Sequence, residues 1–312
     1  MRKGLWIGLG CLVVGFASGC GEDNPMAPVV FEPPASVRFE TGANTIRASW
    51  NASSFEGSGE FGGYNVYVDT VSMAGNNDAA FLAARVSNVV PVNSKSFTVS
   101  QLGDGSSLQQ GVRYFVHVRT RRMNGELSSA SNEVQSAPRP EGDNGSDPSQ
   151  FAYDYDVLAP TKSGYGWNKT TGAGVSYSAS SVNANVVDVF MIEEPNSADE
   201  GSMFVSPSIA NFTAAWATRR ATLFKDLGIG DTAWNTGVAP DPGTMTTSLK
   251  VQLDHTYAIR TEDGHWVKLR IVDLVKNNAV TRSDGSEARL NYARFQHAFQ
   301  LIAGYDRFKS AP

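Results

Sequence analysis

Cysteine is almost absent from this chain: of its 312 residues, only Cys11 and Cys20 are cysteines. Cys11 lies within an apolar N-terminal stretch, so a chain processed at Cys20 would keep a single thiol. One thiol excludes an internal disulfide and a zinc site built from thiolates. Cys20 is then free to serve another chemistry.

Charge is also scarce. Charged residues make up 18% of the chain and the net charge is −5. No run of five or more Lys or Arg occurs, which excludes the electrostatic signature of a nucleic-acid partner. Hydrophobic residues make up 41%, enough to build cores, and global disorder is thereby excluded.

Common catalytic motifs are missing too. The sequence contains no G-x-S-x-G, no H-E-x-x-H and no phosphate-binding G-x-x-x-x-G-K-[ST]. We therefore predict a non-enzymatic protein with no catalytic residues.

The N-terminus has the pattern of an export signal. Met1-Arg2-Lys3 is basic, and Gly4–Phe16 is an apolar run too short to span a bilayer. The following Ala17-Ser18-Gly19-Cys20 resembles a bacterial lipobox. That resemblance implies a signal peptide over 1–19, lipidation of Cys20, and a membrane contact through the lipid. We expect location at the bacterial outer membrane, facing the periplasm or the cell surface.

Two segments look like connectors. Residues 20–34 contain four prolines, typical of an extended tether: Pro25, Pro28, Pro33 and Pro34. Residues 139–150 are rich in Pro, Gly, Asp and Ser and are predicted to be a linker. The chain between and after them divides into domains over 35–138 and 151–312.

Residues 35–138 alternate apolar and polar side chains in short runs separated by turn residues, which predicts a β-sandwich. The segment resembles a fibronectin type III domain through Trp50, Gly63–Tyr67 and the pair Leu102 and Tyr114. Three further positions match the G-x-x-S-x-x-S ending of that family: Gly125, Ser128 and Ser131. His117 alternates with the apolar positions, so we expect an exposed strand histidine.

Residues 151–312 are predicted to be mainly β with one helix. Ala184–Ile192 is a strongly apolar run typical of a central strand. Ser208–Leu227 has apolar residues at helical spacing and is the one helix candidate. In His255–Leu274, two alternating runs share a face only if Ile259 opposes Val267, which predicts a three-residue loop over 262–264.

The other face of this hairpin carries the candidate binding surface. It combines one aromatic ring with three cations: Arg260, Trp266, Lys268 and Arg270. A planar aromatic beside cations suits a polysaccharide or a partner protein. The alternative is that Lys and Arg stems merely cover a sheet face.

The run Tyr257–Arg270 also resembles the corresponding hairpin of HmuY-like lipoproteins. That resemblance implies a β-rich fold and raises haem as a possible ligand. His255 and His265 would lie about 20 Å apart, too far to share one iron. The weak ligand candidates are therefore His265 and His297, each with a second partner, and no other cofactor is expected.

Four aspartates flank the start of the second domain and offer oxygen ligands for Ca²⁺, although no Ca²⁺-loop pattern is present: Asp143, Asp147, Asp154 and Asp156. Overall we expect a non-catalytic, envelope-anchored lipoprotein. Its type III domain would be a spacer that holds a binding or presenting domain off the membrane. The alternatives are a surface haem-binding lipoprotein, and an accessory protein or hydrolase of polysaccharide degradation.

Overall fold

The computed structural model describes residues 31–194 and 201–307. The predicted signal peptide, Cys20 and most of the predicted tether lie outside these residues. The described chain forms 17 strands and two short helices, which confirms the prediction of a mainly β protein. None of its helices is long and apolar enough to cross a membrane.

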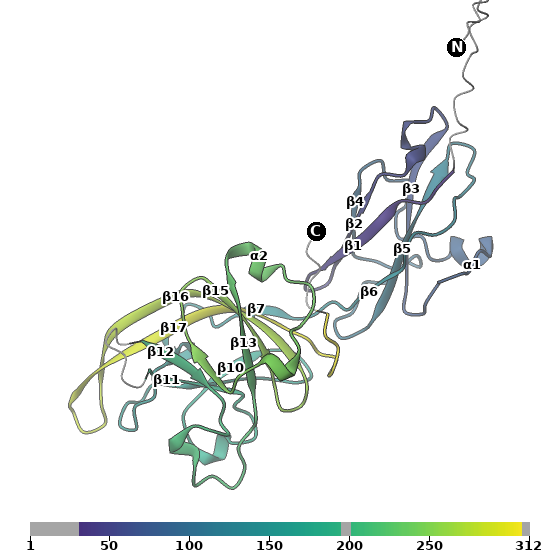
Figure 1. The fold of residues 1–312 in the computed structure, drawn as a ribbon. Helices are drawn as coiled ribbons and strands as arrows, with labels where there is room; N and C mark the ends of the chain where they lie inside the picture. Colours follow the sequence, from purple (N-terminus) through teal and green to yellow (C-terminus); the bar gives the residue numbers. More distant parts are fainter. Residues whose placement is uncertain (1–30, 195–200, 308–312) are drawn as a thin grey trace, which may run out of the picture.

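The N-terminal domain is a sandwich of two three-stranded sheets (Figure 1). One sheet has the order β1-β2-β4: β1 (Ala35–Thr41), β2 (Ile46–Asn51) and β4 (Ser96–Val99). The other has the order β3-β5-β6: β3 (Phe61–Asp69), β5 (Tyr114–Arg122) and β6 (Val134–Ser136). The alternating apolar residues of both sheets form one core, in which the Trp50 ring meets Tyr64 edge-on at 5.4 Å.

The outer face of β3 and β5 is covered as well. The segment after β3 folds back over it and includes α1 (Ala79–Ala83), whose Leu82 packs with Met73 and Tyr67. His117 lies beneath this cover and is fully buried. The prediction of an exposed histidine is wrong because a segment distant in sequence encloses the strand face that alternation alone assigned to solvent.

The second domain packs two larger sheets face to face. A five-stranded sheet has the order β10-β9-β11-β12-β14: β9 (Gly164–Trp167), β10 (Gly174–Tyr177), β11 (Val189–Glu193), β12 (Ser202–Val205) and β14 (Ser248–Lys250). A six-stranded sheet has the order β13-β15-β16-β17-β7, with β8 also paired to β17: β7 (Glu141–Asp143), β8 (Ala152–Tyr153), β13 (Leu223–Ile229), β15 (His255–Arg260), β16 (Trp266–Thr281) and β17 (Glu287–Phe299). Aromatic side chains from both sheets, among them Phe204 and Tyr257, share one core.

The hairpin between β15 and β16 has the predicted register. Ile259 pairs with Val267, and Arg260 with Trp266. The backbone N–H of Thr261 donates to the carbonyl of His265, so the loop is residues 262–264. Gly264 takes a φ of +79°, which a glycine adopts without strain.

The predicted helix over Ser208–Leu227 is wrong. The segment contains a single 3₁₀ turn, Asn211–Thr213, and then enters β13, while α2 (Gly230–Trp234) begins only after that strand. Arg220 interrupts the apolar spacing and forms an ion pair with Asp188. Phe224 instead pairs with Ile259 and joins the core between the sheets, so pairing along β15 prevails over the local helical pattern.

The predicted linker over 139–150 is also wrong in its central part. β7 pairs with β17 along Glu141–Asp143, and the Asn144 side chain bonds the backbone of Phe295 and Ala293. Arg139 is buried, and its backbone N–H donates to the carbonyl of Gly42 in the first domain. The connector is therefore part of a sheet edge rather than a free tether.

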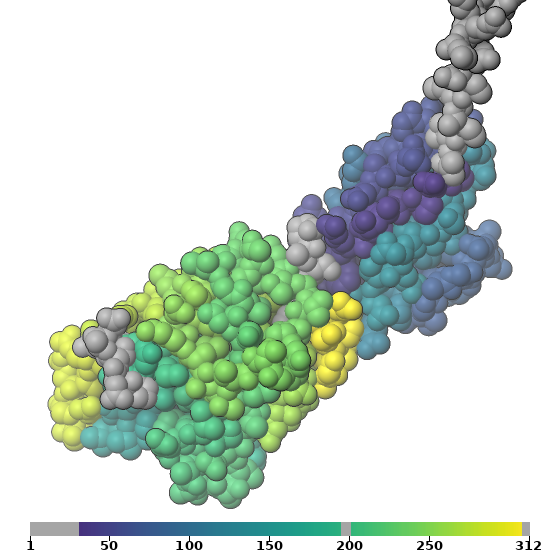
Figure 2. All heavy atoms as spheres, viewed as in Figure 1, coloured from purple at the N-terminus to yellow at the C-terminus, as the bar shows by residue number. Residues whose placement is uncertain are grey.

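The chain near its C-terminus completes this junction. Figure 2 shows its yellow residues between the two domains. The Arg113 guanidinium of the first domain lies 4.9 Å from the centre of the Tyr305 ring. The backbone N–H of Gly111 donates to the carbonyl of Pro138 across 2.9 Å. The two domains thus meet through packed side chains as well as through the chain that joins them.

Candidate functional site in the second domain

The hairpin face chosen from the sequence is covered. Trp266 is 3% exposed and packs against Leu227, Ala239 and Met245. Lys268 is 0% exposed, and its Nζ donates to the carbonyls of Trp234 and Thr236 at 2.7 and 2.6 Å. The segment that follows β13 crosses this face, so the prediction that these side chains form an exposed surface is wrong.

The two arginines of that face are only half-buried, and one of them is neutralised. Arg270 donates to Asp254 at 2.9 Å from Nε and to Asp231 at 2.8 Å from Nη1. Its hydrogen bonds to Asp254 are the main cause that raises the Arg270 pKa. Arg260 lies 6.0 Å from the centre of the Trp266 ring. What remains of the predicted surface is therefore a covered tryptophan with cations at its edge.

The two histidines proposed as weak haem ligands do not fit that role. His265 is 8% exposed, and its Nδ1 bonds the carbonyl of Gln300 at 2.9 Å. His297 is 3% exposed and packs 6.0 Å from the Trp167 ring, where burial lowers its pKa to about 4. Both rings are buried within packed protein in the described structure.

The four aspartates considered for Ca²⁺ separate into two groups. Asp143 accepts a hydrogen bond from the Gly145 backbone, and Asp147 accepts one from Ser149, so each holds a local turn. Asp154 and Asp156 lie together in a polar pocket. No group of three or more acidic, histidine or cysteine side chains within 31–194 and 201–307 is arranged to hold a metal ion.

That pocket, of about 200 Å³, is the candidate site of this domain. Both hydrogen-bond donors and acceptors line it: Asp154, Tyr155, Asp156, Glu193, Asn277, Arg282, Arg289, Leu290 and Asn291. The residues come from β11, β16, β17, the turn between β16 and β17, and the segment after β8, which only the tertiary fold brings together.

Asp154 forms the floor of the pocket and is 3% exposed. Its Oδ2 accepts a hydrogen bond from Ser202 at 3.0 Å, and Ser202 in turn accepts one from Asn291. Its Oδ1 has no partner. Burial is the main cause that raises the Asp154 pKa to about 7, with a smaller contribution from the charge of Glu193. This carboxyl group therefore changes charge near neutral pH.

Asp156 has the opposite environment. The Arg282 guanidinium donates to Asp156 Oδ2 at 2.9 Å from Nε, and this hydrogen bonding is the main cause that lowers the Asp156 pKa. Two neighbouring carboxyl groups are thus held in different states, one ionised and one protonated at mildly acidic pH. Arg289 lies at the exposed edge of the pocket, paired with Glu287 at 2.8 Å.

Sequence reasoning had singled out Asp154 and Asp156, but for Ca²⁺. It missed Arg282, Arg289 and Asn291, which lie more than 120 residues further along the chain. Asn277 has a φ of 56° and lies at a bulge in β16. That bulge is visible only in the structure.

A search of curated proteins finds no match to the chain. Among solved structures, a myokine structure is 22% identical, covers 35% of this chain and 100% of its own, and has a TM-score of 0.25. The titin module A71 from human cardiac muscle is 17% identical, with coverages of 34% and 91% and a TM-score of 0.24.

A DUF4466 family protein from Parabacteroides merdae spans more of the molecule. It is 11% identical, covers 88% of this chain and 95% of its own, and has a TM-score of 0.30. The family model of the fibronectin type III domain matches residues 32–137. This match and the two-sheet sandwich confirm the sequence prediction, and residues 32–137 are a fibronectin type III domain.

Proposed function

We propose that this protein is a non-catalytic, lipid-anchored envelope protein whose fibronectin type III domain is a stiff spacer for a ligand-binding second domain. The observation that carries the spacer role is the packed junction. A flexible connection would leave Arg139 exposed, whereas its side chain is 1% exposed and lies 3.8 Å from Glu141. Burial lowers the Arg139 pKa to about 10.

The path of the chain supports this role. The first described residues pack at one end of the sandwich, where Phe31 meets Phe55 at 4.9 Å. The second domain joins at the other end, where Gly42 follows β1 and bonds Arg139 (Figure 1). A membrane anchor at Cys20 would therefore attach to the end of the spacer opposite the second domain. The lipobox-like residues and the resemblance to HmuY-like lipoproteins support the anchor and the envelope location.

The spacer role is tested by measuring the distance between two spin labels, one per domain, introduced at the exposed positions Thr98 and Thr281 by cysteine substitution. A lipidated Cys20 is a thioether and takes no label. We expect a narrow distance distribution that broadens in the Arg139→Ala variant and not in the matched surface variant Arg47→Ala. A broad distribution in the unaltered junction would contradict a stiff spacer.

For the second domain we propose a neutral, hydroxyl-rich ligand such as a polysaccharide unit, bound at the polar pocket. Carboxylates, amides and guanidinium groups there offer donors and acceptors in close alternation, the chemistry that hydroxyl groups require. Retention on immobilised polysaccharides should fall in Arg289→Ala and persist in Arg47→Ala. Retention unaffected by Arg289→Ala would favour another surface. A sharp one-to-one Soret shift on haemin titration would favour the haem-binding alternative.

A further inference from the structure

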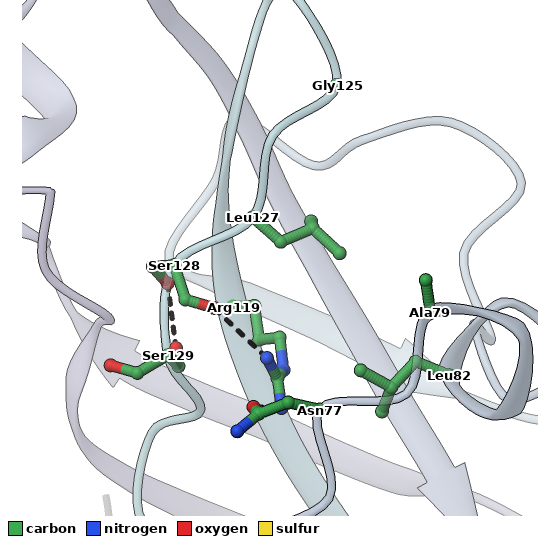
Figure 3. Close-up of a pocket in the computed structure, with 8 residues that line it drawn as sticks. All are labelled: Asn77, Ala79, Leu82, Arg119, Gly125, Leu127, Ser128 and Ser129. Carbon is green, nitrogen blue, oxygen red and sulfur yellow. Dashed lines mark hydrogen bonds between the residues drawn. The ribbon is translucent and has the colours of Figure 1, made fainter.

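The type III domain holds a buried cation whose contacts are all neutral. Arg119, on β5, is 4% exposed. Its guanidinium donates to the carbonyl of Ser128 at 3.1 Å, to the carbonyl of Asn76 at 2.8 Å and to Oδ1 of Asn77 at 3.1 Å. Figure 3 shows the guanidinium between Ser128 and Asn77. Three of its five N–H donors are used in this way, and Nε has no partner.

Two carboxylates of the neighbouring segments hold backbone and hydroxyl groups and make no direct contact with Arg119. Asp78 accepts a hydrogen bond of 2.8 Å from the Phe81 backbone. Glu133 accepts bonds of 2.7 Å from both Ser72 and Met73. Burial is the main cause that lowers the pKa of Arg119, and the electrostatic interaction with Tyr67 offsets only part of this effect. A buried charge that lacks an opposite charge is costly, and an anion that reached it would be bound strongly.

The guanidinium lies at an open surface pocket of about 520 Å³. One wall is apolar, formed by Ala79, Leu82 and Leu127. The rest is polar, formed with Arg119 by Asn77, Ser128 and Ser129 beside Gly125 (Figure 3). Arg121 adds positive charge near the rim of the pocket, beside Gly125. Its Nη2 lies 3.7 Å from the position that a Cβ atom would occupy on Gly125.

We propose that this pocket binds a small organic carboxylate with a short aliphatic part. The carboxylate would pair with Arg119 through charge-assisted hydrogen bonds, the strongest kind available to a guanidinium. The aliphatic part would lie against Leu82 and Leu127, whose wall a bare phosphate or sulfate would leave in contact with water. This site belongs to the type III domain and does not depend on the ligand of the second domain.

The test uses two probes of the same shape, N-acetyl-L-leucine and its uncharged amide, titrated into the mature chain. Amide resonances of Gly125 and Ser128 should shift saturably with the acid. The amide should bind at least about tenfold more weakly, because it lacks the charge-assisted pair.

One variant separates binding from folding. Asn77→Asp converts a neutral partner of Arg119 into a carboxylate at the same position, so it should raise the unfolding temperature and weaken binding of the acid by about tenfold or more. The matched control is Asn51→Asp, the same change on the other sheet, which should do neither. Equal binding of acid and amide, unchanged binding in Asn77→Asp, or no saturable shift with the acid would each overturn the proposal.

Discussion

Ser202 donates a hydrogen bond of 3.0 Å to Oδ2 of Asp154, and the two residues are 48 positions apart in the chain. The bond satisfies half of a buried carboxyl group and leaves Oδ1 without a partner. A protonated carboxyl group tolerates such a site far better than an ionised one. The stability of the second domain therefore depends on pH through this group.

Asp154→Asn should reveal that dependence. The carboxyl group ionises near pH 4 in the unfolded chain and near pH 7 in the folded one, so the unfolded state binds fewer protons between these values. Stability is then lost as the pH rises from about 4 to 7. The asparagine variant should gain relative to the unaltered protein over that window, by up to about 4 kcal/mol.

Urea unfolding at pH 4, 5, 6 and 7 measures this effect. Asp147→Asn, at an exposed position, is the matched control and should run parallel to the unaltered protein. A constant difference between Asp154→Asn and the unaltered protein across the series would show that folding does not raise the Asp154 pKa.

His117 should act in the opposite direction. Burial is the main cause that lowers its pKa to about 4, with the charge of Arg119 adding to it. Because the unfolded chain takes up this proton near pH 6.5, stability is lost as the pH falls from about 6.5 to 4. His117→Leu should remove up to about 3 kcal/mol of that loss.

Thermal unfolding of the type III domain between pH 7 and pH 4 tests this prediction. His297 has the same shift in the second domain, so the unfolding transition of that domain is an internal control and should keep its acid sensitivity. If His117→Leu and the unaltered protein lose stability equally, the histidine is protonated in the folded state.

Trp50→Ala should unfold the type III domain more readily. The side chain is 5% exposed in the sandwich core, and its removal leaves a cavity beside Tyr64. We expect a loss of about 3–5 kcal/mol, the usual cost of truncating a buried aromatic residue. A loss below about 1 kcal/mol would mean that the core closes over the missing ring. Val90→Ala, at an exposed position of the same domain, should cost far less.

Cys20→Ser should abolish lipidation. In cells fed an azido fatty acid, the unaltered protein should take up label and partition with membranes, because two or more acyl chains anchor a protein stably. The serine variant should lose both properties. Equal labelling and equal membrane partition of the two proteins would contradict a lipid anchor at this position.

Local patterns in the sequence were enough for several features. Alternation over β15 and β16 and one glycine predicted the hairpin register, because the pairing of adjacent strands is decided by their own side chains and the short loop between them. The same reasoning predicted the mainly β fold, and the resemblance to a known family predicted the type III domain. For Ser208–Leu227 the prediction of a helix was wrong. Helical spacing reflects a local preference, whereas the pairing of this segment with β15 depends on residues distant in the sequence.

Burial and the sites were decided by tertiary structure. A segment more than 20 residues earlier in the chain covers Trp266 and Lys268. The segment around α1 covers His117. The alternation of side chains within their own strands predicts neither covering. The Asp154 pocket joins residues that are more than 120 positions apart, and Arg119 meets Asn77 across 42 positions. The sequence by itself determined which faces of each strand are apolar. Only the packing of distant segments decided which polar side chains are enclosed, because the environment of a charge depends on everything that surrounds it in space.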